Sequence, residues 1–275
     1  LHEAERSEQW VVGYETAFAS TAGGGIGVDQ VRVELYNRRI ANPRQRFESP
    51  LEAVNFFPEL EPGRVLLAPS ESVARGAELL VRGRPSERGS WWLAYTWSRS
   101  EDLLAAEGAP HKWVPRATDQ PHAFTAALSR RLPRQWQLDL AWRWHTGWPT
   151  TPVTAVPPLP EEPPDDPDDP DDPDDPEGPD DAPAAAEGEE PATGVYGELA
   201  SQRLPPYHRL DMRVSRRWES RRGTFTFFVD VQNVYNRHNV SGFDVTVDDE
   251  DMLKLTGEHW PGIVPSLGIA WQLGG

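Results

Sequence analysis

Hydrophobic and polar residues alternate along much of the chain with the two-residue period that is typical of β-strands. The clearest example is the segment 136–145, in which large apolar residues alternate with polar or small ones: Trp136, Leu138, Leu140, Trp142 and Trp144 against Gln137, Asp139, Ala141, Arg143 and His145. A strand with this pattern has one apolar face and one polar face. Nine such strands are predicted, at 8–18, 28–38, 73–82, 91–98, 122–131, 136–145, 208–218, 224–235 and 264–273.

The connections between the predicted strands alternate between short and long along the chain. Four are turns of a few to about nine residues, and four are loops of roughly twenty to sixty residues. The loop at 39–71 contains five prolines, which remove backbone donors and restrict φ, so no regular element is expected there. Further long loops are predicted at 101–120, at 147–206 and before the last strand.

Two fold classes fit the alternation, because a soluble β-sandwich and a transmembrane β-barrel both have strands with one apolar and one polar face. The unequal connections favour the barrel, since outer-membrane barrels have short periplasmic turns and long extracellular loops. Several of the twelve tryptophans also stand at predicted strand ends, where membrane barrels carry aromatic belts. The predicted fold is therefore all-β, an antiparallel portion of a transmembrane β-barrel.

The negative charge of the chain is concentrated within the longest loop. The segment 161–190 holds 16 of the 44 acidic residues and no lysine or arginine, which leaves 28 acidic against 27 basic residues elsewhere. Its Pro-Asp-Asp repeat favours an extended, disordered chain, with weak calcium capture by the carboxylates as the alternative. Because the remainder is nearly neutral, binding to nucleic acid is not expected.

The residues that would support bond-making chemistry are missing from the sequence or lack the required spacing. There is no cysteine, no G-x-S-x-G elbow, and no metal-ligand spacing among the seven histidines. Acidic and basic residues on the polar faces, such as Asp139 with Arg143 or Asp211 with Arg209 and Arg213, are interpreted as inward-facing charge networks. We predict that the chain is not an enzyme and has no cofactor or metal.

Three motifs resemble the C-terminal barrel of TonB-dependent outer-membrane receptors: R-L-P-P-Y-H-R-L-D-M-R-V at 203–214, F-V-D-V-Q-N-V-Y-N-R at 228–237 and P-S-L-G-I-A-W at 265–271. Shorter matches at 74–79, 92–98 and 147–149 extend the resemblance over nearly the whole chain. The resemblance implies a barrel of about 22 strands, of which these would be the last nine. It also implies a preceding plug and a TonB-contacting segment, so the chain, which starts at Leu1, is expected to be the later part of a longer protein.

The same resemblance implies a Gram-negative outer membrane as the location and its lipid as a partner. The implied function is uptake of a small-molecule substrate, a siderophore, cobalamin or a glycan, driven by the TonB complex through the N-terminal region. The last strand is similar to the signal read by the barrel-assembly machinery, with Ser266, Gly268, Trp271 and Leu273 at the matching positions. The chain departs from the family in continuing with Gly274 and Gly275 beyond the last hydrophobic residue.

The candidate ligand-contacting residues are aromatic or polar residues in or beside the predicted outer loops: His111, Trp113, Arg116, His122, His145, Trp148 and His208. They are selected by position and by chemical character. Two other functions stay open at this point. One is a secreted β-sandwich that binds glycans through its tryptophans, and the other is an outer-membrane hydrolase.

Overall fold

The computed structural model describes residues 3–18, 26–52, 64–106, 109–156, 193–221, 223–247 and 253–273. In this part of the chain the fold is all-β, and the only helical piece is the 3-10 turn η2, Pro133–Gln135. No helix among these residues is long and apolar enough to cross a membrane. The acidic repeat at 161–190 lies outside the described residues.

Nine long strands form one antiparallel sheet in which each strand pairs with its neighbours in the chain order of the long strands. They are β1 (Arg6–Ala17), β2 (Val28–Ala41), β5 (Glu71–Ser86), β6 (Gly89–Ala106), β8 (His122–Leu132), β9 (Trp136–His145), β14 (Tyr207–Ser220), β15 (Gly223–Gln232) and β18 (Val264–Leu273). The prediction of nine strands is confirmed. Several strands are longer than predicted, and β6 continues to Ala106 because its end pairs with β7 (Ala109–Pro115).

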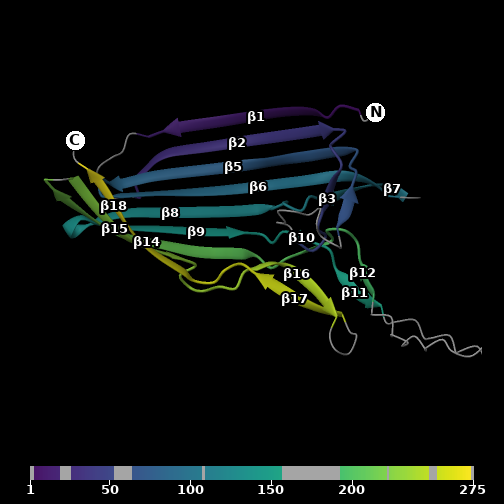
Figure 1. Cartoon of the computed structure of the whole chain (residues 1–275). Helices are drawn as coiled ribbons and strands as arrows, with labels where there is room; N and C mark the ends of the chain where they lie inside the picture. Colours follow the sequence, from purple (N-terminus) through teal and green to yellow (C-terminus); the bar gives the residue numbers. More distant parts are fainter. Residues whose placement is uncertain are drawn as a thin grey trace, which may run out of the picture.

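All short connections lie at one end of the sheet and all long ones at the other, as Figure 1 shows. We call these the turn end and the loop end. The C-terminus lies at the turn end and the N-terminus at the loop end. Strands β1 and β18 form the two edges of the sheet among the described residues.

The register of the strands joins their apolar sides into one continuous face. In the middle of the sheet Leu140 pairs with Leu128 on one side and with Met212 on the other, and Val229 pairs with Val214 and Leu267. A one-residue shift of any strand would bring polar residues to this face, so the alternation specifies the register strongly. No other layer formed by the described residues covers the apolar face, and Leu267 and Ile269 are 76% and 65% exposed. We call it the apolar face and the opposite side the polar face.

The long connections contain short strand pairs, and the prediction that no regular element forms at 39–71 is wrong. These pairs are β3 (Arg46–Glu48) with β4 (Val65–Leu67), β10 (Pro149–Thr150) with β13 (Gln202–Arg203), β11 (Val153–Val156) with β12 (Thr193–Tyr196), and β16 (Val240–Val247) with β17 (Leu253–His259). The prolines bound these strands and do not interrupt them: β3 lies between Pro43 and Pro50, and Pro149 is the first residue of β10.

The buried hydrophobic side chains of the described residues lie at the loop end, in the long connections: Leu51, Leu67, Val114 and Leu204. Backbone bonds tie these connections together, from Thr151 N–H to the Pro50 carbonyl (2.9 Å) and from Leu204 N–H to the Trp148 carbonyl (2.9 Å). We call residues 46–52, 64–70, 114–119, 147–152 and 199–204 the loop-end cap. The best-packed part of the chain is therefore this cap and not the sheet.

Within the sheet, an aromatic ring covers a cross-strand glycine at three places. The pairs are Tyr36 with Gly76, Trp91 with Gly83, and Phe228 with Gly268. A Cβ atom at Gly268 would collide with the ring of Phe228. Such aromatic coverage of glycine pins the register of neighbouring strands.

Candidate functional site

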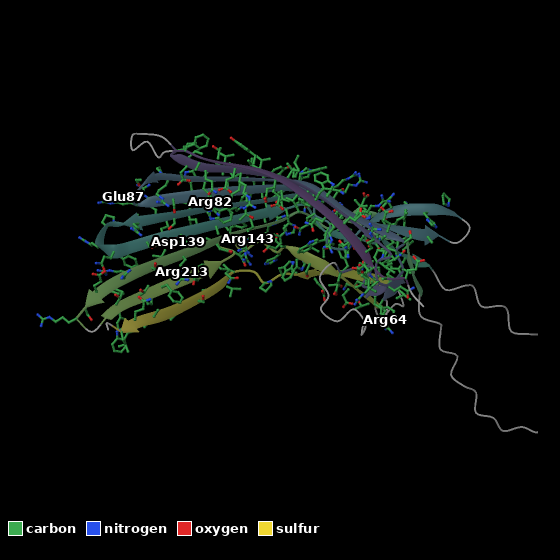
Figure 2. All side chains as sticks on the ribbon, turned by 90° about the horizontal axis from the view of Figure 1, so that it is seen from above. Arg64, Arg82, Glu87, Asp139, Arg143 and Arg213 are labelled. Atoms are coloured by element: carbon green, nitrogen blue, oxygen red, sulfur yellow. The ribbon has the colours of Figure 1, made fainter. Side chains whose placement is uncertain are left out.

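The polar face contains a cavity of about 540 Å³ that is lined by residues of β6, β8, β9, β14, β15 and β18. Its charged lining residues are Asp139, Arg143, Arg209, Asp211, Arg213 and Asp230. Figure 2 labels Asp139, Arg143 and Arg213 on neighbouring strands of this part of the sheet. A volume of this size falls within the range of about 300–1,000 Å³ that is usual for small-molecule sites.

Four of the six charged residues in the cavity form two ion pairs, and Asp139 and Arg143 stand outside these pairs. Arg209 pairs with Asp211 at 2.8 Å, and Arg213 pairs with Asp230 at 3.4 Å. The expected pairing of Asp139 with Arg143 is absent from the described part of the chain, because Asp139 instead accepts hydrogen bonds from Gln137 at 2.9 and 3.0 Å. Arg143 faces Arg209 directly across the strand pair and has no ion-pair partner among the described residues.

Aromatic rings continue from the cavity toward the loop end. Tyr207 pairs with His145 across β14 and β9, and their rings are stacked at 4.8 Å and 6°. The ring of Trp148 lies 4.8 Å from that of His145, and the ring of Trp260 lies 6.3 Å from Trp148. Two predicted ligand residues, His145 and Trp148, therefore come together. Tyr207 and Trp260 were not among the predicted ligand residues, because only the strand register and the folded loops bring them here.

His122 and His208 lie on the other side of the sheet, at the loop-end margin of the apolar face. Each stands two positions before an apolar-face residue, Phe124 and Leu210 respectively. Each also makes a hydrogen bond of 2.8 Å to a phenol oxygen, His122 to Tyr95 and His208 to Tyr235. They therefore lie on the opposite face of the sheet from His145 and from the cavity.

The conformation around His208 depends on two buried asparagines. The side chain of Asn239 accepts a hydrogen bond from the His208 N–H and donates one to the His208 carbonyl, both at 3.0 Å. It thereby replaces the backbone groups of a neighbouring strand. Asn233, which is 1% exposed and has φ 54°, accepts a bond from the Arg237 N–H and donates to the Arg237 carbonyl. Asparagine tolerates this left-handed conformation better than other non-glycine residues. The N-V-Y-N motif thus ends β15 and positions Tyr235.

The other three predicted ligand residues lie on or just beyond β7. His111 and Trp113 are exposed, and Arg116 Nε lies 3.7 Å from the carboxylate of Asp102. The seven predicted residues therefore occupy three separate places, and a ligand role for each stays a prediction.

Two carboxylates are buried at the base of the loop-end cap. Asp102, 2% exposed, accepts hydrogen bonds from Ser72 and Arg46. Asp119, also 2% exposed, accepts a bond from the Ser100 N–H (2.6 Å) and pairs with Arg203 (2.5 Å). Burial alone would lower the pKa of Arg46, but the hydrogen bonds and charges of Asp102 and Glu48 outweigh it, so the net pKa is raised. These pairs link three long connections to the sheet.

The residues of the predicted assembly signal occupy β18, the edge strand at the C-terminus. Ser266 and Gly268 share the polar face with Asp230 and Phe228, their direct partners on β15. Trp271 and Leu273 point to the apolar face and are 52% and 73% exposed, and the ring of Trp271 lies 5.4 Å from Phe225. Among the described residues, no group of three or more histidine or acidic side chains converges to hold a metal ion.

Comparison with known proteins gives one informative match. No family model matches the chain, and no curated protein sequence matches it. The fold is similar to that of FpvA, a TonB-dependent receptor of P. aeruginosa, solved in complex with an iron-bound heterologous pyoverdine. The TM-score is 0.50 at 9% sequence identity, over 98% of this chain and 28% of FpvA. At this identity the match shows a similar β-architecture, and the chain spans only a little over a quarter of that receptor's length.

Proposed function

We propose that the chain forms the C-terminal wall of an outer-membrane receptor that takes up a small-molecule substrate in a TonB-dependent manner. The observation that carries the proposal is the apolar face, which extends across all nine antiparallel strands and is not covered by any other described part of the chain. An exposed apolar surface of this extent would be a liability in water, whereas a bilayer would cover it. The similarity to FpvA supports the same conclusion.

The aromatic residues on this face support a membrane position. Trp10 and Trp97 are 54% and 42% exposed near the loop end, and Trp218, Phe225 and Trp271 are 41%, 39% and 52% exposed near the turn end. Rings at two levels match the aromatic belts at the two membrane interfaces. In this arrangement the loop-end cap would be extracellular and the short turns periplasmic.

The cavity on the polar face would then face the lumen, and its chemistry is non-covalent binding. The stacked pair of His145 and Tyr207 lies on the loop-end side of the cavity, where an entering substrate would first meet the wall. The plug and the segment that contacts TonB belong to the upstream part of such receptors. The substrate could be a siderophore, cobalamin or a glycan, since fold does not determine substrate.

A secreted glycan-binding β-sandwich is the second candidate. It would need a second sheet packed against the apolar face at about 10 Å. The described residues contain no such sheet, because the four additional strand pairs are short and lie at the loop end. No observation favours a hydrolase.

Cell fractionation and a growth assay test the proposal. The chain should sediment with outer membranes, resist extraction with alkaline carbonate, and lose epitopes in the loop-end cap to protease added outside intact cells. Deletion of the gene should abolish growth on one of the three substrate classes, and deletion of the TonB gene should abolish the same growth. A protein that is released into the medium in soluble form would exclude the receptor.

A further inference from the structure

The turn end of the sheet is strongly basic. The adjoining segments 82–89, 129–137 and 216–221, which form three of the short turns and the strand ends beside them, hold nine arginines and only two glutamates. These turns are neighbours, because their strands follow one another in the sheet and the Arg131 N–H donates to the Arg88 carbonyl at 2.7 Å. Figure 2 labels Arg82 and Glu87 in the first of them. The turn end thus has a large excess of positive charge.

The segments hold too few acidic residues to neutralise this charge themselves. Arg217 forms an ion pair with Glu219 at 3.7 Å, and both side chains are more than half exposed. Arg130, Arg134 and Arg216 form no ion pair with any described residue. Like charges at this density repel one another, so the turn end is suited to contact with an anionic partner.

Arg216 is held between aromatic rings at the border between this basic region and the apolar face. Its guanidinium carbon lies 5.3 Å from the ring centre of Trp136 and 4.8 Å from that of Trp218. The Nε atom is buried and has no hydrogen-bond partner among the described residues. A buried N–H donor without an acceptor is costly, which indicates that an acceptor is supplied from outside the chain.

The surroundings of Arg216 indicate which kind of molecule carries the acceptor. Arg216 shares the apolar face with Phe227 and Trp136, its direct cross-strand partners. Arg130 is on the same face, opposite Leu138, two residue pairs farther from the turn than the pair of Leu132 with Trp136. A molecule with its anionic group at Arg216 would therefore have the apolar face alongside it, and acyl chains fit that surface.

We propose that Arg216, held between Trp136 and Trp218 and assisted by Arg130, binds the phosphate of an anionic phospholipid at the turn end of the sheet. The inference rests on the membrane position proposed above. Guanidinium groups bind phosphate through paired N–H donors, and tryptophan rings lie at the level of the lipid headgroups. The site lies next to the short turns, which would be periplasmic. The lipids that it would bind are therefore anionic lipids of the periplasmic leaflet.

Native mass spectrometry of the full chain in a non-ionic detergent tests the site. The probes are dioleoyl phosphatidylglycerol, dioleoyl phosphatidylcholine and soluble glycerol 3-phosphate. We expect the anionic lipid to bind about tenfold more tightly than the zwitterionic one, and Arg216→Gln to remove about tenfold of its affinity. Arg216→Lys should keep part of the preference, because the charge remains but the paired donors are lost.

Two further variants separate a binding role from a structural one. Arg130→Gln changes an exposed side chain, so it should weaken the anionic lipid severalfold without affecting the fold, which circular dichroism monitors. Arg75→Gln is the matched control: Arg75 is also exposed and on the apolar-face side of its strand, but at the loop end, and its loss should change nothing.

Equal affinity for the two lipids, the same loss in the Arg75 and Arg216 variants, or glycerol 3-phosphate binding as tightly as the anionic lipid would each overturn the site. Failure of the lipid site can be distinguished from failure of the receptor proposal. Fractionation in cells can succeed while lipid binding is independent of Arg216, which contradicts the lipid site alone. Conversely, specific lipid binding by a chain that is absent from the outer membrane contradicts the receptor alone.

Discussion

Most side chains of the nine-stranded sheet are half-buried or exposed, whereas the carboxylates of Asp102 and Asp119, at the base of the loop-end cap, are only 2% exposed. The sheet is held mainly by its backbone ladder and by its register, which places apolar residues on one side. The cap is held by ion pairs and hydrogen bonds between segments that are far apart in the chain. The two regions should therefore be destabilised by different changes. The sheet should respond to changes in the medium that contacts its apolar face, and the cap should respond to the loss of a single polar partner.

The largest effect is expected from Asp102→Ala. The substitution leaves Arg46 and Ser72 without their buried acceptor, and breaking a buried pair costs about 3–5 kcal/mol. The cap should open while the sheet persists, which hydrogen exchange would show as lost protection at 46–52 with little change in β9. The control is Glu8→Ala, which removes an exposed ion pair with Arg6 and should be nearly silent. Unchanged exchange in the Asp102 variant would show that the cap is not held by this network.

The exposed apolar face provides the second test. Val229→Arg places a charge in the middle of this face and should destabilise the protein in a bilayer by about 2–4 kcal/mol. Ser129→Arg, on the polar face opposite Asp139, should be tolerated because a carboxylate partner is available. Denaturant unfolding in lipid vesicles measures both variants. If the two cost the same, the apolar face does not face lipid.

The contact of Phe228 with Gly268 gives a smaller effect. Gly268→Ala should cost about 1–3 kcal/mol, because the added methyl group overlaps the ring of Phe228. The double variant Gly268→Ala with Phe228→Ala should recover part of this loss, since the collision is removed. Thermal unfolding of the four members of this cycle measures the coupling. Strict additivity would indicate that the glycine is required for another reason, such as recognition by the assembly machinery.

The smallest effect is expected from Tyr95→Phe, at the loop-end margin of the apolar face. It removes the hydrogen bond between the phenol oxygen and His122 Nδ1, which is worth about 0.5–1.5 kcal/mol. Denaturant unfolding should show a decrease in this range, and Tyr14→Phe, which removes an exposed hydroxyl group on the same face of β1, is the control. A loss as large as that of the Asp102 variant would mean that the margin belongs energetically to the loop-end cap.

The separate places of the predicted ligand residues show where sequence reasoning reaches its limit. His145 and Trp148 were selected with His122 and His208 because all four stand beside predicted long loops. Two-residue periodicity assigns His145 to the polar face and His122 and His208 to the apolar face. The pattern therefore already separates His145 from the other two histidines. Contact with Tyr207 depends on the exact register between β9 and β14, and the alternation excludes only shifts of that register by an odd number of residues.

The sequence by itself determined the nine strands, their two faces and the alternation of short and long connections. These features are local, because the direction of each side chain follows from a period of two along an extended backbone. Only the tertiary structure decided that proline-bounded segments in the long connections pair into short strands, that Asp102 and Asp119 are buried, and that Arg216 lies between two tryptophans. These features depend on contacts between residues that are distant in the chain, and the energy of such contacts is set by burial and geometry that exist only once the chain has folded.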